Sequence, residues 1–177
     1  MFKKIFALTS VLFITACQEN PASMSFIKPD NLPDKYLQII QTAESKATPA
    51  ARQILVIGRE MSASKSDILR GSCWDYANSV YNRAGYTLAK RDTILQGRKG
   101  STSLPDTKMV QPGDFLSYLN HSYHNSEHSA IFIDWIDEPH KNALMLSYPG
   151  EGRAEPARYR AYDLSDVYTI VRPHNNN

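Results

Sequence analysis

Two residues of this sequence have the type and position that nucleophilic catalysis requires, Cys73 and His128. Ser72 and Asp75 flank Cys73 with the three-residue spacing of a capping box, which predicts that a helix begins at the cysteine. A thiol in the first helical turn lies near unpaired backbone N–H groups and the positive end of the helix dipole. We therefore expect a Cys73 pKa below the free value of about 8.5, and a nucleophilic thiolate.

The competing interpretation of Cys73 is a structural one. Ala77, Val80 and Ala84 recur on the same face of the predicted helix, so Cys73 could simply pack as a small apolar residue. The chain has one other cysteine, Cys17. If Cys17 is lipidated, Cys73 has no disulfide partner within the chain, and an unpaired thiol in an oxidising compartment favours a functional role.

His128 opens the most apolar predicted strand, residues 128–136. A polar residue at the mouth of a buried strand is held rigidly at the edge of a cleft, which is the position a general base needs. An imidazole beside the thiol would accept its proton. The alternative is a histidine that is hydrogen-bonded at a strand end and has no further role.

The spacing of His121, His124 and His128 also permits a second chemistry, a shared zinc ion. Residues 120–127 are turn-like, and no pattern of Cys, Asp or Glu ligands accompanies the histidines. We expect no metal and no other cofactor, with zinc kept as an alternative. His140 and His174 are expected to be solvated.

The N-terminus predicts export. Residues 1–16 combine a short basic start with an apolar run too short for the about 20 residues that span a bilayer, as in a signal peptide. Residues 14–17, ITAC, resemble a bacterial lipobox, in which the cysteine is acylated and becomes the new N-terminus. We expect residues 17–31 to be the lipidated N-terminus and tether. Gln18 is compatible with the periplasmic face of the outer membrane.

The charge balance bears on partners. Lys3 and Lys4 belong to the predicted signal and account for the excess of 20 basic over 18 acidic residues. The remaining chain is formally neutral and has no basic footprint for nucleic acid, which we therefore exclude as a partner. Membrane contact is expected through the lipid only, and the oligomeric state is left open.

The order of predicted elements is helices first and strands afterwards. Amphipathic spacing and stop signals predict helices over residues 33–47, 49–61 and 73–84, with Gly85 as the stop of the third. Short β-branched or aromatic runs predict strands over residues 114–119, 128–136, 143–148, 158–162 and 167–172. This order indicates an α+β domain with N-terminal helices packed on an antiparallel sheet. We expect one domain over 32–173 and a polar tail over 174–177.

Three segments resemble cell-wall hydrolases. GSCWDYA (71–77) resembles the helix start of CHAP amidase/peptidase domains, and QPGDF (111–115) resembles the segment that opens the sheet in NlpC-type peptidases. EHSAIFI (127–133) resembles the histidine strand of both groups. The three segments occur in the family order, and the resemblance covers residues 68–172.

The resemblance implies a papain-like fold and a cysteine peptidase or amidase. Cys73 would be the nucleophile and His128 the base, and the substrate an amide bond in a peptidoglycan stem peptide. Family members orient the imidazole with a third polar residue on the next strand, where this chain offers Ser147 or, as the next candidate, Tyr148.

The roles of four basic residues and the departures from the family pattern keep other interpretations open. Arg98, Lys99, Arg153 and Arg158 could recognise stem-peptide carboxylates or could simply be solvated. Neither Ser147 nor Tyr148 is the family's usual third residue, and Glu127 replaces the glycine that precedes the family's histidine. The alternative function is therefore a non-catalytic wall-binding or structural lipoprotein on the same fold.

Overall fold

The structure is a computed structural model that describes residues 26, 28, 32–63, 68–100 and 103–174. The predicted signal peptide, the lipidation site Cys17 and most of the predicted tether lie outside these residues. Within the described ranges, no helix has the length and apolar character needed to cross a membrane.

Three helices precede the strands of the sheet, as predicted: α1 (Asp34–Lys46), α2 (Pro49–Ala63) and α3 (Cys73–Arg83). Each is amphipathic and buries its apolar face. In α3 the buried residues include Ala77 and Val80, at the helical spacing that predicted this face. Short 3-10 turns occur at Leu88–Lys90, Thr107–Met109 and Glu151–Arg153.

Six strands form one antiparallel sheet in the order β1-β6-β2-β3-β4-β5, which confirms the α+β class. The strands are β1 (Arg91–Gln96), β2 (Phe115–Asn120), β3 (Ser126–Asp137), β4 (Asn142–Ser147), β5 (Arg158–Asp163) and β6 (Val167–Pro173). Strand β1 is not among the predicted strands. Its side chains are at least partly exposed, and it forms an edge by pairing with β6.

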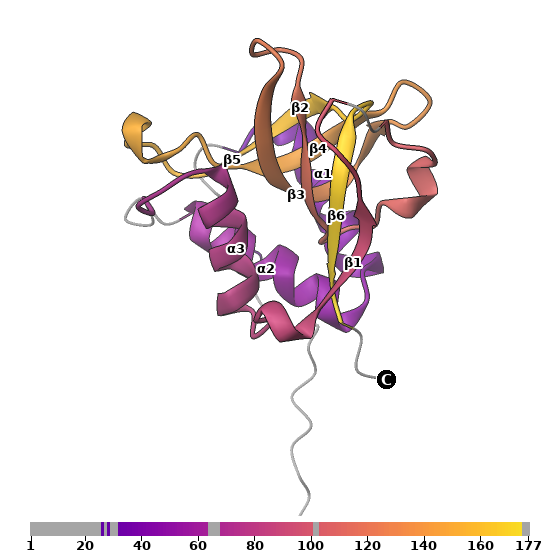
Figure 1. Cartoon of the computed structure of the whole chain (residues 1–177). Helices are drawn as coiled ribbons and strands as arrows, with labels where there is room; N and C mark the ends of the chain where they lie inside the picture. The colour runs from indigo at the N-terminus through magenta and orange to yellow at the C-terminus, as the bar shows by residue number, and fades with distance from the viewer. Residues whose placement is uncertain (1–25, 27, 29–31, 64–67, 101–102, 175–177) are drawn as a thin grey trace, which may run out of the picture.

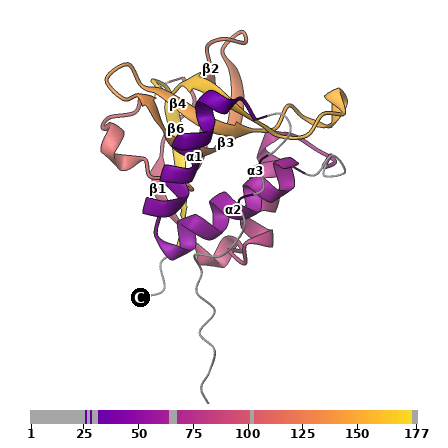
Figure 2. The same ribbon diagram turned by 180° about the vertical axis from the view of Figure 1, so that it is seen from behind.

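The sheet separates two hydrophobic cores. Side chains such as Ile131 and Leu146 pack against all three helices, whereas Phe132 and Met145 point to the other face, where loop residues such as Leu104 cover them. Figure 1 shows the helices below and behind the sheet, and Figure 2 shows α1 lying across the sheet from behind. Strand β3 lies in the middle of the sheet and packs against α3, so the helix that begins at Cys73 contacts the strand that carries His128.

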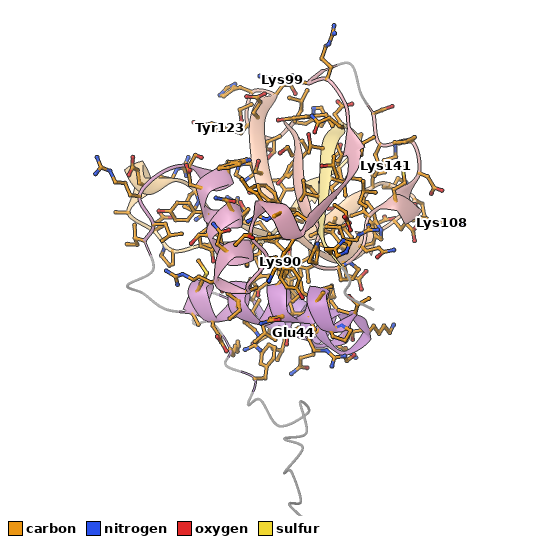
Figure 3. The ribbon with its side chains drawn as sticks, turned by 60° about the horizontal axis from the view of Figure 1, so that its bottom comes forward. Glu44, Lys90, Lys99, Lys108, Tyr123 and Lys141 are labelled. Atoms are coloured by element: carbon orange, nitrogen blue, oxygen red, sulfur yellow. The ribbon has the colours of Figure 1, made fainter. Side chains whose placement is uncertain are left out.

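Buried ion pairs connect elements within the sheet and within the helical layer. Asp114, which is fully buried before β2, forms a two-point ion pair with Arg172 of β6 at 2.8 and 2.7 Å. In the helical layer, Arg59 of α2 pairs with Glu44 of α1 at 2.7 Å. Figure 3 shows Glu44 at the opposite end of the molecule from Lys99.

Candidate active site

Capping contacts between the residues around Cys73 fix the start of α3. The Ser72 hydroxyl accepts from the backbone N–H of Asp75 at 3.4 Å, and the Asp75 carboxylate accepts from the Ser72 N–H at 2.7 Å. The predicted capping box is thereby confirmed. Gly71 precedes it with φ +117°, and a Cβ there would lie 2.5 Å from the Asp75 carboxylate. Gly71 also exchanges two hydrogen bonds with Glu151, which tie the helix start to the loop after β4.

His128 lies on β3 and shares a hydrogen bond with a residue of β4. Its Nε2 lies 2.7 Å from the Ser147 hydroxyl oxygen, and that oxygen lies 2.9 Å from the phenol oxygen of Tyr162 on β5. When Nε2 carries the proton, it donates to Ser147, Ser147 donates to Tyr162, and Nδ1 keeps its lone pair. The three strands therefore supply a chain of contacts that leaves one imidazole nitrogen available as a base.

Two tyrosine rings, those of Tyr118 and Tyr162, lie next to the His128 imidazole and confine it. Tyr118, which is paired with His128 across β2 and β3, meets the imidazole edge-on with ring centroids 5.7 Å apart. The Tyr162 ring lies 5.4 Å from the imidazole and 5.6 Å from the Tyr118 ring. The Tyr118 hydroxyl is buried and has no hydrogen-bond partner within the described part of the chain. These rings restrict the imidazole to the orientation that Ser147 selects.

Burial and a nearby cation keep the imidazole neutral. Desolvation, with a smaller contribution from the Arg160 charge, lowers the pKa of His128 from 6.5 to about 4. At neutral pH the imidazole is therefore unprotonated and can accept a proton.

The predicted lowering of the Cys73 pKa is wrong for the free protein. Desolvation raises the pKa of the Cys73 thiol, and the charge of Asp75 adds to the increase. The backbone N–H groups of Ser129, Trp74 and Cys73 itself oppose this by stabilising the thiolate, but burial has the larger effect. The pair consequently rests as a neutral thiol and a neutral imidazole. The contribution of Ser129 also shows that the sulfur faces the strand position directly after His128.

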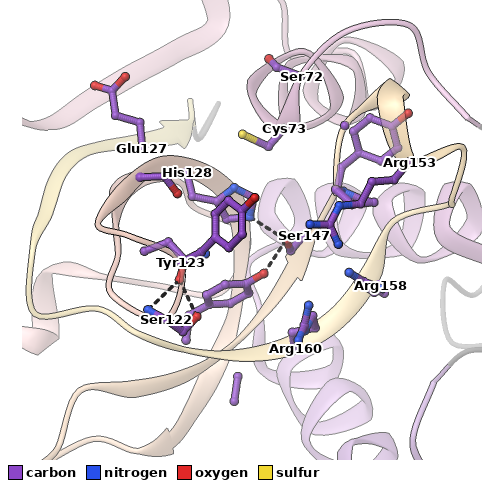
Figure 4. A pocket seen from close by; sticks show the side chains of 17 residues that line it. Ser72, Cys73, Ser122, Tyr123, Glu127, His128, Ser147, Arg153, Arg158 and Arg160 are labelled. Atoms are coloured by element: carbon purple, nitrogen blue, oxygen red, sulfur yellow. Dashed lines mark hydrogen bonds between the residues drawn. The ribbon is translucent and has the colours of Figure 1, made fainter.

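A single cavity of about 490 Å³ contains the predicted site residues. Cys73, His128 and Ser147 all line it, and Figure 4 shows the Cys73 side chain next to the His128 ring. Its other lining residues include Tyr123 and Glu127 on one side and Arg153, Arg158 and Arg160 on another. The arrangement places a thiol, a neutral base and several hydrogen-bond donors around one solvent-accessible space.

Tyr148, the alternative third residue, is engaged elsewhere. Its hydroxyl donates to the Leu69 carbonyl and its ring stacks on Tyr76 with centroids 5.1 Å apart. Ser147 is thus the partner of the imidazole, although both residues line the cavity. Of the four basic residues named from the sequence, Arg153 and Arg158 line the cavity, whereas Arg98 and Lys99 do not.

The histidines that could share zinc have separate partners. His121 contacts Asn125 and Asp166 at 2.8 and 3.1 Å, and His124 lies against the Tyr123 ring. No group of three or more His, Cys, Asp or Glu side chains that could hold a metal ion occurs within the described residues.

Sequence reasoning missed Tyr162, Tyr118 and Arg160. Tyr118 and Tyr162 come together with His128 only through strand pairing, which no single-strand pattern encodes. The alternation of Arg158, Arg160 and Tyr162 along β5 is the one sequence signal that could have placed the three side chains on a common face.

The chain matches no family model, no curated protein and no solved structure.

Proposed function

We propose that this protein is a cysteine hydrolase of the NlpC/CHAP-like class, with a papain-like fold, that cleaves an amide bond in peptidoglycan stem peptides. The observation that carries the proposal is the convergence of Cys73, His128 and Ser147 on one open cavity. A lipid on Cys17 would anchor the exported enzyme in the cell envelope, beside the wall.

In the first half of the reaction, the Cys73 sulfur attacks the amide carbonyl carbon as its proton moves to Nδ1 of His128. Backbone N–H groups in the first turn of α3 have no intrahelical acceptor and can stabilise the oxyanion. The capping box occupies the N–H of Asp75 and leaves those of Cys73 and Trp74, which face the sulfur. The C–N bond then breaks, and the imidazolium returns its proton to the leaving amine.

In the second half, water hydrolyses the thioester. His128 accepts a proton from water as the hydroxide oxygen attacks the acyl carbon, and the C–S bond breaks to release a carboxylic acid product. The proton returns to the sulfur. The neutral resting pair suits this cycle because the imidazole starts unprotonated in each half.

One observation favours the second candidate, a wall-binding lipoprotein without catalysis. The Cys73 pKa is raised, so the free protein holds little thiolate at neutral pH. A binding protein would use the same cavity and arginines without bond cleavage.

The two functions separate in one experiment with purified peptidoglycan. The wild-type chain is incubated with peptidoglycan, the soluble products are identified by mass, and bound protein is measured by pelleting. Hydrolysis predicts products bearing a new amine and a new carboxylate, absent with Cys73→Ser, while Cys73→Ser still pellets with the wall. Pelleting without product release by either protein would support the binding function.

A further inference from the structure

Three guanidinium groups line the same wall of the cavity. Arg158 and Arg160 alternate with Tyr159 and Ala161 on β5, so they share a face with Tyr162, whose hydroxyl contacts Ser147. Arg153 lies in the 3-10 turn after β4 and also lines the cavity. Figure 4 shows the three arginines gathered on the Ser147 side of the site.

Little negative charge balances this wall. Arg158 pairs with Glu155 at 2.8 Å, but Arg153 and Arg160 form no ion pair with any described residue. Glu127 is the one carboxylate among the described residues that line the cavity, and it contacts Lys99 at 3.4 Å and Tyr168 at 3.5 Å. The β5 wall therefore carries a net positive charge beside the nucleophile and its base.

We propose that Arg153 and Arg160, with Arg158 beside them, form a subsite for a substrate carboxylate close to the amide that Cys73 attacks. The planar guanidinium group donates two parallel hydrogen bonds, which match a carboxylate better than a neutral amide. The claim that the bound carboxylate belongs to a substrate rests on the proposed hydrolase function. The attraction that these arginines exert on an anion approaching Cys73 does not, and it can be measured without turnover.

The first test compares two alkylating reagents that have similar size but differ in charge. Iodoacetate is anionic and iodoacetamide is neutral, and both react with a thiolate by displacing iodide. The full chain with Cys17→Ser leaves Cys73 as its single thiol. The ratio of the two rates, measured at pH 8.5 where the His128 imidazole is neutral, reports the potential at the sulfur.

We expect the rate ratio to fall about threefold for each of Arg153→Ala and Arg160→Ala, and to fall less at high salt, since charges around an open cavity interact weakly and salt screens them. Arg160→Lys should keep most of the ratio. Arg83→Ala, at the other end of α3, is the matched control and should leave the ratio unchanged. An equal ratio in wild type and the double variant Arg153→Ala/Arg160→Ala would overturn the subsite. A Cys73 that neither reagent modifies in the folded protein would overturn both the subsite and the hydrolase.

The second test uses turnover. Once a cleaved stem peptide is identified, a matched pair is made in which the carboxylate nearest the scissile amide is kept or converted to a carboxamide. Wild type should prefer the carboxylate by about tenfold or more in kcat/KM, and Arg153→Ala/Arg160→Ala should remove the preference while still cleaving the carboxamide. A preference that survives in the double variant would contradict the subsite, and no cleavage of either peptide would contradict the hydrolase instead.

Discussion

The Nε2 atom of His128 lies 2.7 Å from the hydroxyl oxygen of Ser147, on the neighbouring strand of a sheet whose next strand adds Tyr162 to the same oxygen at 2.9 Å. A serine has no charge with which to stabilise an imidazolium. Ser147 instead selects the tautomer of the imidazole. A hydroxyl that donates its hydrogen to Tyr162 accepts a hydrogen bond from Nε2–H, so the proton lies on Nε2 and Nδ1 is unprotonated. The orientation of the base then depends on two hydrogen bonds in series.

Because Tyr162 acts through Ser147, their effects on catalysis should not add. We expect Ser147→Ala to lower kcat about tenfold and Tyr162→Phe about threefold, in line with the roughly 1 kcal/mol that a neutral hydrogen bond contributes. The double variant Ser147→Ala/Tyr162→Phe should match Ser147→Ala alone. The rate of product release from peptidoglycan is measured for the wild type, the two single variants and the double variant. If the loss of kcat in the double variant equals the product of the two single losses, Tyr162 acts independently of Ser147.

The low pKa of His128 makes part of the folding stability dependent on pH. The group binds its proton near pH 6.5 when unfolded but only near pH 4 when folded, so the unfolded state gains protons first as the pH falls. Stability present above pH 6.5 is lost between pH 6.5 and 4, by about 3 kcal/mol for this shift.

Urea unfolding at pH 7 and pH 4 measures this loss. From pH 7 to pH 4, the free energy of unfolding of the wild type should fall by about 3 kcal/mol more than that of His128→Gln, which has no titrating group at this position. Comparing the two proteins removes the contribution of other acidic groups. Parallel losses would mean that the imidazole is not desolvated in solution.

The conformation of Gly71 predicts a specific cost at the start of α3. Gly71→Ala introduces a Cβ at φ +117° and 2.5 Å from the Asp75 carboxylate, so it should lower the free energy of unfolding by about 3 kcal/mol through strain and a damaged cap. Gly85→Ala has φ +85° but no atom within 4 Å, and should cost about 1 kcal/mol. Denaturant titration compares the two, and equal losses would indicate that the capping box contributes nothing.

The buried ion pair before β2 predicts a large effect of a single substitution. Arg172→Met leaves the fully buried Asp114 carboxylate without its partner and should cost about 3 kcal/mol or more. Asp34→Asn removes the exposed contact with Lys28 and should leave the unfolding free energy almost unchanged. Thermal or urea unfolding distinguishes the variants, and equal stability would place Asp114 in contact with water.

The elements that carry Cys73 and His128 could be predicted because their signals are local. The Ser72–Asp75 spacing marks the start of α3, and an apolar run marks β3. Strand β1 has no such signal, since its exposed side chains alternate poorly and its pairing with β6 is long-range.

The Cys73 pKa was mispredicted for a physical reason. The helix start does present N–H groups to the sulfur, as expected, but the neighbouring strand also excludes water from it, and a local sequence pattern does not contain that burial. Tyr162 and Arg160 likewise reach the site only because β5 pairs with β4.

The central claim is that Cys73 and His128 act together on an amide of the wall. The most direct measurement is the initial rate at which new amines appear in purified peptidoglycan, compared among wild type, Cys73→Ala and His128→Gln at pH 7.5. We expect release by wild type, none above background with Cys73→Ala, and a loss on the order of 10²–10⁴-fold with His128→Gln. Release that persists in Cys73→Ala, or none by wild type, would contradict it.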